Sequence, residues 1–147
     1  MKKQYSVEKT LAINARPSDI FNVLTHLEQW NQWTQSISEM SILNEDVPGL
    51  GARVKVLQPK LPPAIWTITE IKQDKSFTWE KESVGLKMIS EHLILSVANE
   101  TSVTIRMTYE GFLANLFYKL THSLTDRYMT MEINGLKKEC EKSAPPL

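Results

Sequence analysis

LANLFYKLTHSLTDRYMTMEINGLKKECE (residues 113–141) is a long segment in which apolar side chains recur at helical spacing. The residues near one face of such a helix are Leu113, Leu116, Phe117, Leu120, Leu124, Tyr128, Met131 and Gly135. At about 1.5 Å per residue, the segment spans roughly 40 Å, enough to cross a small domain. The pattern predicts a long C-terminal helix whose apolar face must be covered by another layer.

Most of the remaining chain shows the two-residue period of β-strands. The first such segment runs from Tyr5 to Ile13. Six more follow: Met40–Leu43, Ala52–Leu57, Ile65–Lys72, Ser76–Glu82, Lys87–Val97 and Ser102–Tyr109. Short polar connections such as Asp74–Lys75 and Asn99–Glu100 favour antiparallel neighbours. We therefore expect a seven-stranded antiparallel sheet, curved by its own twist.

Two short helices are expected between the first and second strands. Pro17 and Asp19 suit the first turn of a helix. The backbone N–H groups of that turn have no acceptor within the helix, so proline, which has no N–H, loses no hydrogen bond there. A carboxylate such as that of Asp19 is favoured by the positive end of the helix dipole. In Glu28–Ser36, Trp30 and Trp33 lie at helical spacing. The order is then strand, two short helices, six strands and a long helix, which is an α+β arrangement.

Composition indicates one globular domain covering residues 1–147, since 41% of the chain is hydrophobic and 23% is charged. Seventeen basic residues balance seventeen acidic ones, so the chain lacks the basic excess typical of nucleic-acid binding. No apolar run approaches the roughly 20 residues of a membrane span. The single cysteine, Cys140, has no internal disulfide partner. We expect a cytoplasmic protein, as a monomer or homodimer, without nucleic acid or stable membrane insertion.

The familiar catalytic and cofactor motifs are missing from the sequence. His26, His92 and His122 fall in separate elements, without a spacing that suits zinc. There is no Cys-x-x-Cys and no Gly-x-Ser-x-Gly elbow, and Gly49–Gly51 lacks the remaining glycine of a nucleotide loop. We therefore expect no metal, no cofactor and no recognisable catalytic constellation.

Four short patterns carry a family resemblance. They are ARPSDIF (residues 15–21), WNQW (30–33), WTITEI (66–71) followed by FTW (77–79), and GLKKECE (135–141). In this order the chain resembles the START-like (SRPBCC) superfamily and, within it, the polyketide cyclase/dehydrase-like branch. The resemblance implies a helix-grip fold, in which a curved seven-stranded antiparallel sheet wraps around the C-terminal helix and leaves a cavity between them.

Under that resemblance, strand alternation and the helix face assign side chains to the cavity. The expected ligand-binding residues are Trp66, Trp79, Glu91, Met107, Tyr109, Phe117, Leu120, Leu124, Tyr128 and Met131. Apolar and aromatic walls of this kind suit a lipid-like or aromatic ligand. The loop Gln58–Pro63 and the region of Trp30 and Trp33 would form the mouth.

Charged residues on the strands raise a separate question of orientation. Glu91 shares the parity of Leu93 and Leu95 and is expected to face inward. A buried carboxylate needs a partner, so Glu91 would pair with Lys9 or Arg127 or would lie at the cavity mouth. His92 has the opposite parity and would face solvent. The orientation of Arg106 and Arg127 is left open.

Three functions fit these expectations. The leading hypothesis is a binding protein for an apolar or aromatic small molecule. The second is an enzyme of the polyketide cyclase/aromatase type, in which Glu91 or Tyr109 moves protons. The third is a protein-interaction module on the same fold.

Overall fold

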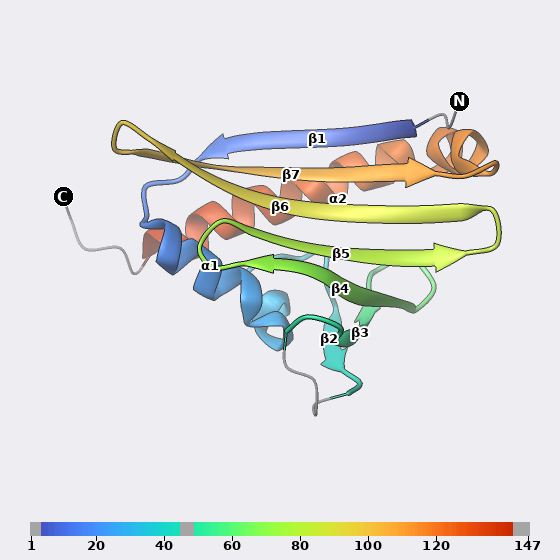
Figure 1. Cartoon of the computed structure of the whole chain (residues 1–147), viewed down its shortest axis with the longest axis horizontal. Coiled ribbons are helices and arrows are strands. Elements are labelled where there is room, and N and C mark those ends of the chain that lie inside the picture. Colours follow the sequence, from blue (N-terminus) through green and yellow to red (C-terminus); the bar gives the residue numbers. More distant parts are fainter. Residues whose placement is uncertain (1–3, 45–48, 143–147) are drawn as a thin grey trace.

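The computed structural model describes residues 4–44 and 49–142, which form an antiparallel sheet with the long helix α2 packed along one face (Figure 1). The elements are β1 (Gln4–Ala12), α1 (Pro17–Thr25), the 3-10 helix η1 (Leu27–Gln32), β2 (Glu39–Ile42), β3 (Arg53–Leu57), β4 (Ala64–Lys72), β5 (Ser76–Ser83), β6 (Leu86–Val97), β7 (Glu100–Glu110) and α2 (Ala114–Lys142). This confirms the expected α+β helix-grip architecture. The second short helix is a 3-10 helix that ends earlier than expected, at Gln32.

The strands form a seven-stranded sheet in the order β1-β7-β6-β5-β4-β3-β2, with every neighbouring pair antiparallel. The turn between β6 and β7 has two residues, Ala98 and Asn99, with φ angles of 51° and 69°. Positive φ at both central residues is typical of the type I′ turn that closes a tight hairpin. The turn therefore lies one residue earlier than the expected Asn99–Glu100.

This two-residue turn fixes which side chains of β6 face the helix. Directly opposed residues of an antiparallel pair point to the same side of a sheet. Ile105 is 1% exposed and lies opposite His92, and Met107 lies opposite Ser90. The inward side chains of β6 are Leu86, Met88, Ser90, His92 and Ile94. The expectation that Leu93 and Leu95 face inward is wrong, and Leu95 is 61% exposed.

Helix α2 contacts β1 and β7 along its length and α1 near its C-terminal end. Two hydrogen bonds join that end to the β1–α1 connection: the Glu141 carboxylate accepts from the Asn14 N–H at 2.8 Å, and the Lys137 ammonium donates to the Ala12 carbonyl at 3.0 Å. Lys137 also donates to Glu141 at 2.5 Å. The Lys137 bond, followed by the Asn14 bond, lowers the pKa of Glu141.

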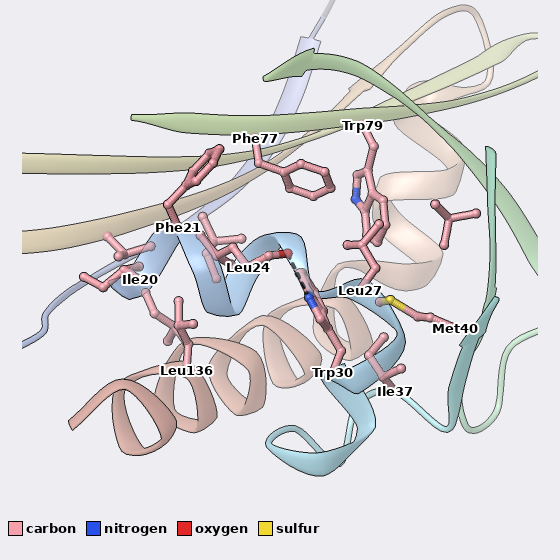
Figure 2. Packing of buried hydrophobic residues seen from close by; sticks show 14 of the residues in the cluster. Ile20, Phe21, Leu24, Leu27, Trp30, Ile37, Met40, Phe77, Trp79 and Leu136 are labelled. Carbon is pink, nitrogen blue, oxygen red and sulfur yellow. Dashed lines mark hydrogen bonds between the residues drawn. The ribbon is translucent and has the colours of Figure 1, made fainter. Parts of the chain in front are cut away.

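The core is centred on Trp30 of η1 (Figure 2). Its side chain is 1% exposed, its indole Nε1 donates to the Leu24 carbonyl at 3.0 Å, and its ring lies 5.6 Å from the ring of Trp79. Burial of an indole is favourable when its N–H has an acceptor, which Leu24 provides here. Trp30 therefore connects α1, η1 and the sheet.

Cys140 lies in this core, 2% exposed, near the C-terminal end of α2. Burial, followed by nearby carboxylates, raises the pKa of its thiol from 9.0 to about 12. Only the thiolate is nucleophilic, so the folded protein keeps an unreactive thiol.

We predict that Ellman's reagent does not react with Cys140 at pH 8 in the native protein and reacts fully after unfolding in urea. Folding raises the pKa of the Cys140 thiol. The contribution of this thiol to the stability of the folded protein is therefore fully present below about pH 9 and is lost progressively as the pH rises toward 12. Urea unfolding between pH 8 and 11 should show a steeper loss of stability for the native sequence than for Cys140→Ala. Rapid labelling of the native protein would contradict this prediction.

Candidate functional site

A cavity of about 110 Å³ lies between the sheet and α2. It is lined by Trp30, Ser36, Ile37, Val56, Gln58, Leu61, Trp66, Trp79, Met88, Ser90, Met107, Phe117, Thr121, Leu124, Thr125, Tyr128, Met129 and Glu132. These side chains come from η1, the connection between η1 and β2, the loop between β3 and β4, strands β3 to β7, and α2. The cavity is therefore located where the helix-grip architecture predicts it.

One wall of the cavity is formed by three tryptophans from three elements. Trp66 on β4 and Trp79 on β5 have ring centroids 5.8 Å apart, and Trp30 packs against Trp79 from the side of η1. Such tilted contacts are favourable for aromatic pairs and hold the rings in place. The wall offers large, rigid apolar surfaces on which a flat ring can stack.

The charged residue of the lining is Glu132 of α2, which pairs with His92 of β6. The imidazole Nε2 lies 3.2 Å from the Glu132 Oε1, and Nδ1 lies 3.1 Å from the Phe77 carbonyl oxygen. His92 is 0% exposed, and the rings of Trp30, Phe77 and Trp79 surround it at 5.5, 5.2 and 6.2 Å. The histidine is thus fixed behind the wall, while the carboxyl group of Glu132 is part of the lining.

The loop between β3 and β4 closes one side of the cavity. Gln58 and Leu61 belong to the lining, and Leu61 is 37% exposed, so this side faces solvent. The Tyr128 hydroxyl of α2 donates to the Pro59 carbonyl oxygen, which attaches the loop to the helix. Lys60 has a φ angle of 68°, a strained conformation for a residue with a side chain. The expected role of this loop in a mouth agrees with that placement, whereas Trp30 lies deep in the core.

Six of the ten expected ligand-binding residues line the cavity: Trp66, Trp79, Met107, Phe117, Leu124 and Tyr128. Four do not: Glu91, Tyr109, Leu120 and Met131. A ligand-binding role for the first six stays a prediction that their position supports.

Glu91 lies on the outer face of the sheet, so its expected inward orientation is wrong. Arg106 of β7 lies opposite Glu91 and also opposite Glu8 of β1. Its guanidinium group is 3.0 Å from the Glu91 carboxylate and 2.7 Å from that of Glu8. Opposed charges on one face of a sheet attract, which explains why all three share the solvent side. Lys9, proposed as a partner of Glu91, instead pairs with Asp126 at 2.5 Å.

The expectations for His92, Leu120, Met131 and Tyr109 also need correction. His92 was expected in solvent and is buried in the core. Leu120 is 73% exposed on the outer side of α2, and Met131 is half-buried outside the lining.

Tyr109 is fully buried in a separate cluster with Leu86 and Ala114, where its hydroxyl hydrogen-bonds to Thr125 at 2.7 Å. Desolvation raises its pKa, so the phenol stays protonated. Arg127, whose orientation was left open, is exposed to solvent.

Glu132 is the charged lining residue that the sequence reasoning missed. It lies four residues after Tyr128, and Tyr128 lies four residues after Leu124, so all three share one face of α2. That spacing is the signal that points to it. A carboxyl group at this position interrupts the apolar series, so the apolar spacing alone did not include it.

Among residues 4–44 and 49–142, no group of three or more His, Cys, Asp or Glu side chains is arranged to hold a metal ion. No helix within these described ranges is long and apolar enough to span a membrane.

The sheet, the gripping helix and the cavity between them define a helix-grip protein with a site between its two layers. The sequence matches a family model described as polyketide cyclase/dehydrase and lipid transport over residues 4–141. The chain therefore belongs to this family, and the expected resemblance is confirmed. A comparison with curated protein sequences finds no significant match.

Solved structures with the same fold cover nearly the whole chain. Ara h 8.0201 has a TM-score of 0.75 at 11% identity, covering 96% of this chain and 100% of its own. Norcoclaurine synthase from Thalictrum flavum, solved with dopamine and hydroxybenzaldehyde, has a TM-score of 0.74 at 11% identity, covering 99% and 91%. The di-domain ARO/CYC StfQ from the steffimycin biosynthetic pathway has a TM-score of 0.72 at 10% identity, covering 95% and 51%. At these identities the similarity shows the fold.

Proposed function

We propose that this protein binds a small aromatic molecule in the cavity between the sheet and α2. The observation that carries the proposal is the position of the cavity against the wall formed by Trp30, Trp66 and Trp79. Burial of apolar ligand surface contributes about 25 cal/mol per Å², and ring stacking adds to it. The ring compounds present in the norcoclaurine synthase structure support the same class of ligand.

The size of the cavity favours a single ring over a long lipid. Its volume of about 110 Å³ is smaller than the roughly 150 Å³ of an apolar cavity that holds benzene. Drug-sized ligands occupy pockets of about 300 Å³ or more.

We predict that toluene changes the tryptophan emission of the protein and raises its Tm. Three of the four tryptophans line the cavity, so an occupant should alter their surroundings directly. Saturation at 100 times the Kd would stabilise the folded state by about 2.7 kcal/mol. Fluorescence titration and thermal unfolding measure the two effects, and a flat response up to the solubility limit of toluene would contradict the proposal.

A matched pair of variants locates the binding. Ser90→Leu should fill the cavity from β6 and abolish the response to toluene, because Ser90 is 5% exposed and lines the cavity. Ser96→Leu makes the same change on the same strand at an exposed position outside the lining, and should leave the response intact. Circular dichroism confirms that both variants are folded.

A cyclase-type reaction is the second candidate function, and Glu132 is the observation that favours it. The earlier basis for this hypothesis is lost, since Glu91 forms an ion pair on the outer face and Tyr109 lies outside the lining. A carboxyl group in an apolar cavity, in contact with a histidine, is the arrangement in which general acid–base chemistry occurs.

A further inference from the structure

We propose that the Oε2 atom of Glu132 is the recognition group of the cavity and that it selects a ring carrying an uncharged hydrogen-bond donor, such as a phenolic hydroxyl. This inference rests on the proposed function, because it specifies the ligand that the same cavity accepts. It follows from counting the protons that the pair of His92 and Glu132 can hold, and from the position of the pair at the aromatic wall.

The Nδ1 atom of His92 lies 3.1 Å from the Phe77 carbonyl oxygen, and a carbonyl oxygen can only accept a hydrogen bond. Nδ1 therefore carries a proton. This fixes how the ring meets Glu132 through its other nitrogen.

The Nε2 atom of His92 lies 3.2 Å from the Oε1 atom of Glu132. A hydrogen bond there needs one proton, which belongs either to an imidazolium facing a carboxylate or to a carboxylic acid facing a neutral imidazole. In both cases the proton lies between these two atoms. In both cases the pair has no net charge, which allows it to be buried.

The remaining carboxyl oxygen of Glu132 is Oε2. Because the shared proton is held at Oε1, Oε2 has no proton in either state and can only accept. Within residues 4–44 and 49–142, no hydrogen bond reaches Oε2. The Glu132 side chain is 13% exposed and lines the cavity, so its free acceptor is available to an occupant.

The complementary ligand follows from the charge and shape of the site. The acceptor requires a donor on the ligand. The neutral pair gives no compensation for a charged ligand, and an uncompensated charge is costly to bury. Phenols are uncharged at pH 7, as the tyrosine side chain is. A phenol can stack on the aromatic wall and donate its proton to Oε2.

Three probes of similar size test this inference: phenol, which donates; anisole, which keeps the oxygen but has no hydrogen to donate; and toluene, which has no oxygen. Calorimetric titration should show that the native protein binds phenol about tenfold more tightly than anisole, as expected for one hydrogen bond to Oε2. Glu132→Leu should reduce this ratio to about one and leave the affinity for toluene within threefold of its native value.

The control and the second variant keep the test decisive. Glu139→Leu makes the same substitution on α2 outside the cavity lining and should leave the ratio unchanged. Glu132→Gln keeps an accepting oxygen without the charge, and should give an intermediate ratio even if Glu132→Leu folds poorly.

The possible failures are distinct. A phenol-to-anisole ratio that neither Glu132 variant changes overturns the role of Glu132, while binding of toluene in the same titrations still supports the proposed function. Absence of binding by all three probes overturns the proposed function and this inference with it.

Discussion

Gly135→Ala is expected to lower the free energy of unfolding by about 2 kcal/mol, although alanine is the better helix former. Gly135 lies inside α2, where this substitution would ordinarily stabilise a helix by about 1 kcal/mol. Here a Cβ atom would overlap the carbonyl oxygen of Trp33, a backbone atom that follows η1 and has little freedom to move. Steric overlap in a packed region costs about 1–3 kcal/mol and displaces the backbone.

Urea unfolding of the two proteins measures this difference, with Asn134→Ala as the control. Asn134 precedes Gly135 on the same helix and is exposed, so its replacement should raise stability by a few tenths of a kcal/mol. Equal or higher stability of Gly135→Ala would show that α2 does not need this close approach to η1.

Gly135 shows which part of the fold could be predicted from the sequence and which could not. The pattern GLKKECE contributed to the family resemblance, and the order of elements followed from period and turns alone. The reason for the glycine became visible only when Trp33, about a hundred residues earlier, was placed against it. A contact between segments so far apart has no local signal in the sequence.

In strand β6, the alternation of side chains was not enough to predict which face of the strand points inward. Its two faces carry similar numbers of apolar side chains, so alternation alone did not decide between the parity of Glu91 and that of His92. The deciding information was in β7, which has one clearly apolar face, and in the short hairpin turn between the two strands. A two-residue turn makes residues of opposite parity face each other, so inward Ile105 requires inward His92. This inference was possible from the sequence.

Helix α2 was assigned the correct extent but a partly incorrect inner face. The side chains that face the cavity include Thr121, Thr125 and Glu132, whereas Leu120 is exposed. Hydrophobic periodicity assumes that the inside is apolar, and a binding cavity departs from that rule. The disagreement is therefore greatest at the residues that matter most for the proposed ligand.

His92→Phe is expected to destabilise the protein by about 3 kcal/mol, and adding Glu132→Leu to it should recover most of this loss. Phenylalanine retains the contacts with Trp30, Phe77 and Trp79, so packing changes little. What the single variant removes is the partner of Glu132, leaving its carboxyl group against an apolar cavity. Loss of one partner from a buried pair costs about 3–5 kcal/mol, whereas replacement of both by apolar residues is often nearly neutral.

Urea unfolding at pH 7 of the native protein, His92→Phe, Glu132→Leu and the double variant completes the thermodynamic cycle. Additive effects would mean that the two side chains are not coupled, and the proton count that makes Oε2 an obligate acceptor would then fail. Strong coupling would show that His92 and Glu132 stabilise each other in the folded protein. The double variant should still bind toluene and should no longer prefer phenol to anisole, because the cavity keeps its aromatic wall and loses its acceptor.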